Sequence, residues 1–207
     1  MADREKLLEI LSRMIADIEE NRQYLTELDN VIGDGDHGIN LDRGFRAVAE
    51  QMETYKNMNV DEILKDVGQQ LMKVVGGSSG PLFGTAFKKA GVSVKGKTEI
   101  SMEDYLAMMD TAIVKIQDLG GAIEGEKTML DAMIPAQKAI RASYEADGDV
   151  KKAFAAGVAA AEAGVEYTKT IIATKGRAAY LGERSIGHQD PGATSYTLML
   201  KDIAALV

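Results

Sequence analysis

The sequence predicts an all-α protein, and three observations support this fold class. Apolar residues recur every three or four positions along most of the 207-residue chain, which is typical of one-sided helices. Runs of alternating β-branched residues are missing, so no strand is predicted. Glycine-marked breaks separate segments of helical length. We therefore expect about eight helices in a single domain, residues 1–207, arranged as an antiparallel bundle or barrel.

Five apolar stripes define the helices in chain order. Their spacing places the apolar side chains on one face and leaves the other face polar. In the fourth stripe a glutamine takes one of the apolar positions. The stripes are Leu7, Leu11, Met14 and Ile18; Ile63, Val67, Leu71 and Val74; Tyr105, Met109, Ala112, Ile116 and Leu119; Leu130, Met133, Gln137 and Ile140; and Tyr196, Leu200, Ile203 and Val207.

Local signals mark where several helices begin, end or approach one another. Ser101 followed by Asp104 resembles a capping box, which starts a helix. Pro81 is expected in the first turn of another helix, where its missing N–H does no harm. The Ala- and Gly-rich segment 153–163 permits close packing of one helix on another. Breaks are expected at residues 91–97, 120–125 and 146–149.

Composition excludes several classes of function. The net charge of −8 argues against nucleic acid and against an anionic membrane surface as partners. No apolar run approaches the roughly 20 residues of a membrane helix, and the N-terminal residues lack a signal-peptide pattern. There are no cysteines, so disulfides, thiolate metal sites and thiol nucleophiles are excluded. We expect a cytoplasmic protein.

Residues 91–98, Gly-Val-Ser-Val-Lys-Gly-Lys-Thr, match the P-loop expression. A P-loop requires a buried strand before the loop and a helix directly after it. The preceding residues 81–90 are expected to be helical, and the next helix begins only at Ser101. The segment is therefore interpreted as a basic turn between helices.

Residues 33–38, Gly-Asp-Gly-Asp-His-Gly, match the dinucleotide fingerprint G-x-G-x-x-G. Two aspartates stand between these glycines, and two unit charges about 5 Å apart repel by roughly 3 kcal/mol at an effective dielectric of 20. Such a loop rejects phosphate unless a cation lies between them. A Rossmann fold is therefore not predicted.

The same acidic loop suits a magnesium site. Asp29, Asp34 and Asp36 supply three carboxylates within eight residues, and Mg²⁺ prefers hard oxygen ligands combined with substrate phosphates. An EF-hand is excluded, because Gly38 and Phe45 stand where that motif needs acidic or amide ligands. The alternative is an acidic turn whose aspartates cap the next helix.

A second loop supplies anion donors. Gly76-Gly77-Ser78-Ser79-Gly80 leads into the helix near Pro81, and free amides at a helix start together with hydroxyl groups form an anion site. Cations on one loop and amides on the other would together hold a polyphosphate. The alternative is a simple capped turn.

The third loop, residues 175–192, carries Arg177 and Arg184, which are candidates for a phosphate clamp or a flap over the nucleotide. An ordinary surface loop is the alternative.

These three loops also resemble a known family. Residues 33–40, 76–84 and 182–195 are similar to the magnesium loop, the phosphate loop and a long signature of the dihydroxyacetone kinase nucleotide-binding domain, and the resemblance covers essentially the whole chain. It implies an eight-helix antiparallel barrel with two Mg²⁺ ions on Asp29, Asp34 and Asp36. We expect no catalytic residue on this chain beyond the metal and phosphate ligands. The nucleotide contacts it implies are His37, Gly38, Ile39, Asn40, Ser78, Ser79, Gly120 and Met129 (the last two on the side of the base), Arg177, Asp190, Pro191 and Gly192.

The length resembles that of the free-standing L subunit of the phosphoenolpyruvate-dependent system. In that system bound ADP is phosphorylated by a phosphohistidine protein, the M subunit. The resulting ATP passes its γ-phosphoryl group to dihydroxyacetone held covalently on a separate K subunit. A phosphohistidine on His37 or His188 is less typical than an orienting or capping role. Alternatives are a module of an ATP-dependent dihydroxyacetone kinase or a fatty acid kinase, and a nucleotide-loaded subunit that docks to a transcription regulator. The oligomeric state, a homodimer included, and the choice of ADP or ATP are left open.

Overall fold

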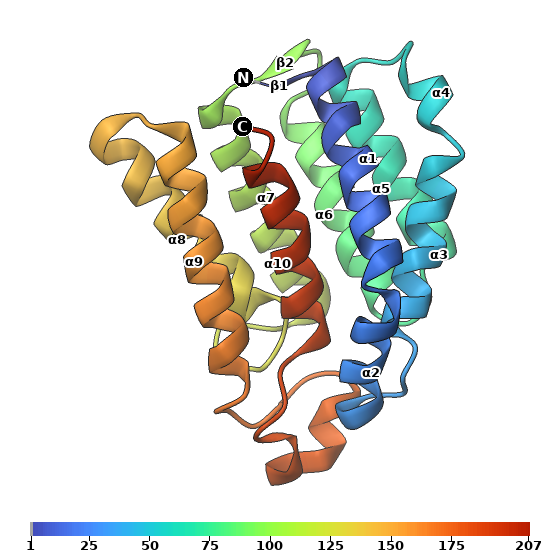
Figure 1. Ribbon diagram of the computed structural model, residues 1–207, viewed down its shortest axis with the longest axis vertical. Helices are drawn as coiled ribbons and strands as arrows, with labels where there is room; N and C mark the ends of the chain where they lie inside the picture. The colour runs from blue at the N-terminus through green and yellow to red at the C-terminus, as the bar shows by residue number, and fades with distance from the viewer. Residues whose placement is uncertain (1) are drawn as a thin grey trace. The chain divides into compact units, whose positions relative to one another are not determined.

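In the computed structural model, which describes residues 2–207, the chain forms two compact units. The first contains the chain up to Glu19, Asn40–Gly121 and Leu206–Val207, and the second contains Glu20–Ile39 and Ala122–Ala205. The elements follow in the order β1 (Ala2–Asp3), α1 (Arg4–Glu20), α2 (Arg22–Ile32), α3 (His37–Ala49), α4 (Met52–Tyr55), α5 (Val60–Val74), α6 (Ser79–Ser93), β2 (Glu99–Ile100), α7 (Met102–Gly120), α8 (Leu130–Asp147), α9 (Val150–Thr168), the 3-10 helix η1 (Arg177–Ser185) and α10 (Pro191–Ala204) (Figure 1).

The all-α prediction is confirmed, with two differences in detail. The described residues hold ten α-helices and one 3-10 helix rather than about eight helices, because the chain breaks after α1 and again around the short α4. Two strands of two residues each form an antiparallel pair, Ala2 with Ile100 and Asp3 with Glu99. Strands this short leave no periodic signal in the sequence. The single-domain prediction for residues 1–207 stays a prediction.

In the first unit, α6 packs against both α5 and α7. The α5–α6 contact is close: a Cβ atom on Gly68 would lie 2.5 Å from the carbonyl oxygen of Gly84. Only glycine fits at such a distance, so this pair of glycines lets the two backbones touch. That contact fixes the course of α6, whose first turn follows the predicted phosphate loop.

In the second unit, α8 packs on α9, and α10 lies against both of them and against α2. The prediction of close packing for residues 153–163 is confirmed. A Cβ atom on Gly157 would lie 2.3 Å from Cγ1 of Ile140 on α8. One residue beyond the predicted segment, a Cβ atom on Gly164 would lie 2.1 Å from the carbonyl oxygen of Asp131.

Most predicted stripes form the core. The stripes that begin at Leu7 and at Leu130 are buried throughout, and the latter includes the polar Gln137. The stripe in α7 is partly wrong, because Leu119 is 53% exposed while Met102 and Leu106 are buried. The predicted stripe and the stripe that is actually buried both have helical spacing, and only tertiary packing distinguishes them.

The predicted helix boundaries are largely confirmed. Ser101 and Asp104 form the capping box, with the Asp104 amide donating to Ser101 Oγ and the Ser101 amide donating to Asp104 Oδ2, both at 3.1 Å. Pro81 lies in the first turn of α6. The P-loop-like segment 91–98 begins inside α6 and follows no strand, which confirms the interpretation against a P-loop.

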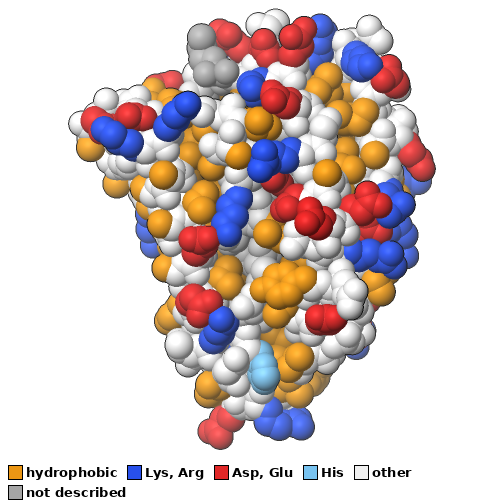
Figure 2. Space-filling view, viewed as in Figure 1, with side chains coloured by type: hydrophobic (Ala, Val, Ile, Leu, Met, Phe, Trp, Pro, Cys, Tyr) orange, Lys and Arg blue, Asp and Glu red, His pale blue; other side chains and the backbone are white. Residues whose placement is uncertain are grey.

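The described helices include none that is both long and apolar enough to cross a membrane. On the face drawn in Figure 2, acidic and basic side chains are interspersed rather than gathered by sign.

Candidate nucleotide and magnesium site

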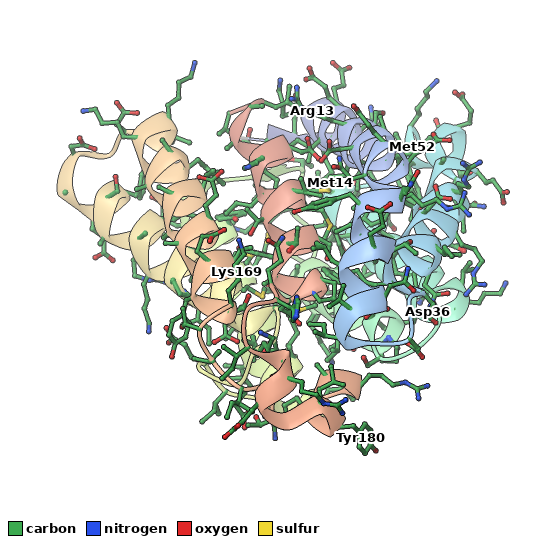
Figure 3. The ribbon with its side chains drawn as sticks, turned by 60° about the horizontal axis from the view of Figure 1, so that its bottom comes forward. Arg13, Met14, Asp36, Met52, Lys169 and Tyr180 are labelled. Carbon is green, nitrogen blue, oxygen red and sulfur yellow. The ribbon has the colours of Figure 1, made fainter. Side chains whose placement is uncertain are left out.

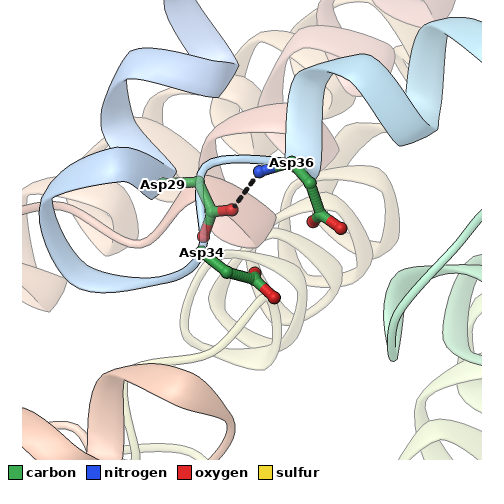
Figure 4. Close-up of side chains that lie close together, drawn as sticks. All are labelled: Asp29, Asp34 and Asp36. Carbon is green, nitrogen blue, oxygen red and sulfur yellow. Dashed lines mark hydrogen bonds between the residues drawn. The ribbon is translucent and has the colours of Figure 1, made fainter.

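Three carboxylates converge where α2 gives way to α3. Asp29 lies buried in the last turn of α2, and Asp34 and Asp36 lie in the loop before α3. Each offers an oxygen atom, and these atoms lie within 4.8 Å of one another (Figure 4). The sequence thus placed the three acids in one turn, and the structure brings their side chains together.

Hydrogen bonds from the loop fix the Asp29 carboxylate. Its Oδ2 atom accepts from the Asp36 amide at 2.9 Å and from the His37 amide at 3.2 Å. Its other oxygen faces Gly33, where an added Cβ atom would lie 1.9 Å from Asp29 Oδ1. Gly35 turns the chain with a φ of 72°, in the left-handed region that favours glycine. Asp29 is therefore held by one oxygen while the other is not engaged by these two amides.

The loop carries an excess of negative charge. Two carboxylates whose oxygen atoms lie within 4.8 Å of each other repel by at least roughly 3 kcal/mol at an effective dielectric of 20. Arg177 offsets part of this charge, since its Nη2 atom lies 2.9 Å from Asp34 Oδ2. Three hard oxygen donors with this spacing fit a divalent cation such as Mg²⁺, which commonly combines carboxylates with phosphate oxygens and water. The residues present thus fit the predicted metal.

Arg177 reaches Asp34 because the third predicted loop contains the 3-10 helix η1, which lies against α2. Arg177 is the first residue of η1, and its side chain is largely exposed. Tyr180 on the same helix is 86% exposed and projects into solvent (Figure 3). Arg184 lies in the last turn of η1.

His37 is a buried neutral residue that connects the acidic loop to α10. Its Nε2 atom lies 3.0 Å from Ser195 Oγ, and the ring also bonds to the Pro191 carbonyl. Burial lowers the pKa of His37 to about 4, against the opposing charges of Asp29 and Asp36. An imidazole that is buried and makes two hydrogen bonds is poorly placed to accept a phosphoryl group. The expected orienting role for its side chain fits better.

The start of α10 gathers four of the predicted nucleotide residues in the second unit. Asp190 caps the helix through a 2.7 Å bond from the Ala193 amide to its Oδ2, and burial raises the pKa of this carboxyl to about 7. Pro191 and Gly192 form the first turn. A Cβ atom on Gly192 would lie 3.5 Å from Cβ of Met129, so Met129 lies beside this turn.

Gly38 and Ile39 follow His37 in the first turn of α3. An added Cβ on Gly38 would lie 2.0 Å from the carbonyl oxygen of Arg22, so α3 starts in close contact with the start of α2. Ile39 is 40% exposed.

The remaining predicted residues, Asn40, Ser78, Ser79 and Gly120, belong to the first unit. Arg43 joins α3 to the chain before the phosphate loop: it donates to Asn40 Oδ1 at 2.8 Å and to the Val74 carbonyl at 3.0 Å. Ser78 and Ser79 lie at the start of α6, as expected for an anion site at a helix N-terminus. Gly120 ends α7.

Sequence reasoning missed the side chains that support this site. Lys127 is fully buried beside the start of α8, and Ser195 bonds to His37 from 158 residues away. Asp131 accepts from the Gly125 amide at 2.5 Å and from the Thr128 amide at 2.7 Å. The spacing Thr128-x-x-Asp131 is a capping signal that the sequence did offer. Ser195 ends the signature 182–195, but nothing in the sequence links it to His37, and nothing local marks Lys127.

A family model described as "DAK2 domain" matches residues 31–205. The chain is 43% identical over 196 residues to the "PEP-dependent dihydroxyacetone kinase 2, ADP-binding subunit DhaL" of Listeria innocua, covering 94% of this chain and 90% of that protein. It is 42% identical to the corresponding subunit of Escherichia coli K12, covering 88% and 87%. Human "Triokinase/FMN cyclase" is 31% identical, and there the match covers only 34% of the longer protein.

Among solved structures, the dihydroxyacetone kinase of C. freundii matches with a TM-score of 0.74 at 28% identity, over 96% of this chain and 34% of that one. The same enzyme in complex with AMP-PNP and Mg²⁺ matches with a TM-score of 0.75 at 27% identity, over 96% and 33%. This chain thus spans about a third of the length of that kinase.

Proposed function

Because this chain belongs to the DAK2 domain family, we propose that it is the ADP-binding subunit of a phosphoenolpyruvate-dependent dihydroxyacetone kinase. Sequence identity supports this branch: it is 39–43% with four such subunits and 31–36% with four kinases that match over only 30–34% of their length. The observation that carries the proposal is the convergence of Asp29, Asp34 and Asp36 beside Arg177.

In this proposal ADP stays bound and is phosphorylated in place. A phosphohistidine protein, the M subunit, gives up its N–P bond as a terminal ADP oxygen forms the new bond to phosphorus. The ATP so formed then passes its γ-phosphoryl group to a hydroxyl of dihydroxyacetone on the K subunit, and ADP is regenerated. The chain is thus a transferase subunit with a resident nucleotide, and we place it in the cytoplasm.

Asp29, Asp34 and Asp36 would hold two Mg²⁺ ions, which when bound neutralise the charge of the phosphate oxygens. The side chains themselves position and do not react. Asp29 is fixed by two amides, and Arg177 stands beside Asp34 with a guanidinium that can pair with phosphate. The amides at the start of α6, next to Ser78 and Ser79, would bind phosphate oxygens.

His37 is buried and neutral, and its ring is hydrogen-bonded to Ser195 and Pro191, so this proposal assigns no nucleophile or general base to this chain. Catalysis by this chain would therefore rest on positioning and electrostatics. The base that activates the hydroxyl of dihydroxyacetone would belong to the K subunit.

The metal assignment is tested with Asp34→Asn, which removes one charge and keeps the shape. The matched control is Asp118→Asn on α7, whose carboxylate pairs with Lys115 on the surface. We expect ADP affinity in Mg²⁺, measured by isothermal titration calorimetry, to fall at least about tenfold in the first variant and to stay unchanged in the control. Unchanged, metal-independent ADP binding by Asp34→Asn would show that the assignment is wrong.

The phosphotransfer branch is tested with the wild-type protein carrying ADP. Phosphoenolpyruvate and the purified phosphohistidine relay proteins are added, and the bound nucleotide is identified by mass spectrometry. We expect conversion of bound ADP to ATP that requires the complete relay. If bound nucleotide exchanges freely with ATP in solution and the relay converts none of it, the ATP-dependent alternative is correct.

A further inference from the structure

Lys127 is a cation in the protein interior. Its side chain is only 2% exposed, and its backbone φ of 60° lies in the left-handed region that residues with a Cβ atom rarely adopt. Burying an ammonium group is unfavourable unless its three N–H donors are satisfied. Both the burial and the backbone conformation therefore require strong compensating contacts.

Carbonyl groups from two other segments supply these contacts. Nζ of Lys127 donates to the carbonyl oxygen of Thr168, at the end of α9, and to that of His188, just before α10. A third carbonyl, that of Ile171, lies 3.5 Å away. The ammonium group thus joins the chain before α8 to the chain on both sides of η1.

The same junction holds the start of α10. Oγ1 of Thr168 accepts from the Asp190 amide at 2.9 Å and donates to the Val165 carbonyl at 2.6 Å. Two residues beyond Lys127 lies Met129, and two beyond Asp190 lies Gly192. These two residues are neighbours, since a Cβ atom on Gly192 would lie 3.7 Å from the Met129 amide nitrogen.

We propose that Lys127 is a positioning residue that fixes Met129 against the first turn of α10 and thereby sets the affinity for the adenosine part of the nucleotide. The inference rests on the proposed function and on the family resemblance, which implies that Met129 lies on the side of the base. Lys127 itself does not touch the ligand, because its three donors face protein carbonyls. The effect of Lys127 on binding affinity must therefore differ between ligands that carry a base and ligands that do not.

The test is Lys127→Met, which keeps the length of the side chain and removes the donors. The control is Lys138→Met on α8, where the ammonium group is 68% exposed and pairs with Glu124. Binding of ADP and of inorganic pyrophosphate, both with Mg²⁺, is measured by calorimetry. We expect Lys127→Met to weaken ADP binding at least about tenfold, or about 1.4 kcal/mol, and to leave pyrophosphate binding unchanged. Lys127→Arg, which restores the charge and donors, should recover part of the loss.

A second measurement needs no ligand. Hydrogen exchange of the peptide that spans residues 186–195 should be faster in Lys127→Met than in the wild type or in Lys138→Met, because the segment before α10 loses its anchor. Equal exchange in all three proteins would overturn the proposal. Equal weakening of ADP and pyrophosphate would also overturn it, since that result indicates general damage to the fold.

If Lys127→Met does not fold, Thr168→Val is a second variant that tests the same proposal. This variant preserves shape and the buried ammonium group but removes the acceptor of the Asp190 amide. We expect the same selective loss of ADP affinity, and unchanged ADP affinity would refute the proposal. Failure of the wild-type protein to bind either ligand would instead contradict the proposed function.

Discussion

Substitution of Gly33 by alanine probes the acidic loop without removing a carboxylate. The added Cβ atom would lie 1.9 Å from Asp29 Oδ1, and ordinary contact begins at 3.4 Å. Gly33 has a φ of −131°, so the perturbation does not arise from a left-handed backbone. The Asp29 carboxylate must therefore withdraw by about 1.5 Å, or the loop must shift by a similar distance.

Either movement has two measurable consequences. Withdrawal of Asp29 strains the bonds from the Asp36 and His37 amides, and loss of one bond to a charged acceptor lowers the free energy of unfolding by about 2 kcal/mol. Mg²⁺ requires ligand distances of about 2.0–2.1 Å, so a ligand displaced by more than 1 Å no longer binds. We expect the affinity for Mg²⁺ to fall about 10- to 100-fold.

The assay is calorimetric titration of Mg²⁺ into the ADP-bound protein, with urea unfolding of the metal-free protein measured in parallel. A folded Gly33→Ala variant with wild-type Mg²⁺ affinity would refute the reasoning, because the carboxylate that must move would then not be a ligand. Loss of stability without loss of affinity would likewise assign Asp29 to the alternative considered above, an acidic helix cap.

Three further predictions concern stability, each measured by urea unfolding of the metal-free protein. Asp190 has its pKa raised to about 7 by burial, so it contributes stability while protonated, and this contribution is lost as pH rises from about 4 to 7. A pKa raised from 3.8 to about 7 corresponds to about 4 kcal/mol, which the partial exposure of the Asp190 residue reduces to about 2. Asp190→Asn should remove this dependence of stability on pH. Gly164→Ala places a Cβ atom 2.1 Å from the Asp131 carbonyl oxygen and should cost about 1–3 kcal/mol, whereas Gly120→Ala, with its only near contact at 3.5 Å, should cost nothing. Ser101→Ala removes the cap of α7 and should cost about 1 kcal/mol. Unfolding curves like those of the wild type for Asp190→Asn, Gly164→Ala or Ser101→Ala would contradict the contact described for that residue.

Much of the fold was predictable because its causes are local. The capping box at Ser101 marks a helix start through bonds between residues three positions apart, and Pro81 marks another because it lacks an N–H group. The stripe from Leu7 to Ile18 needs only helical spacing. In α7 two sets of apolar residues have equally good helical spacing, so the buried face could not be chosen from the sequence. Two-residue strands are likewise too short for any pattern to reveal.

The candidate site likewise contains a part that the sequence could predict and a part that it could not. Asp29, Asp34 and Asp36 could be grouped because one short turn carries them all. The partners that hold the site together come from distant segments: Arg177 for Asp34, Ser195 for His37, and three backbone carbonyls for Lys127. A lysine held by carbonyl groups leaves no pattern in its own neighbourhood, because its partners contribute backbone and any residue type would serve.

The two amide bonds to Asp29 have a consequence for how an ion would be captured. Because the Asp36 and His37 amides hold the Asp29 carboxylate, its position has support from the protein itself, and removal of a bound ion by a chelator should leave the turn in place. A cation that binds to Asp34 would compete with the Arg177 guanidinium for this carboxylate. A turn supported in this way could lose and regain a bound cation repeatedly without unfolding.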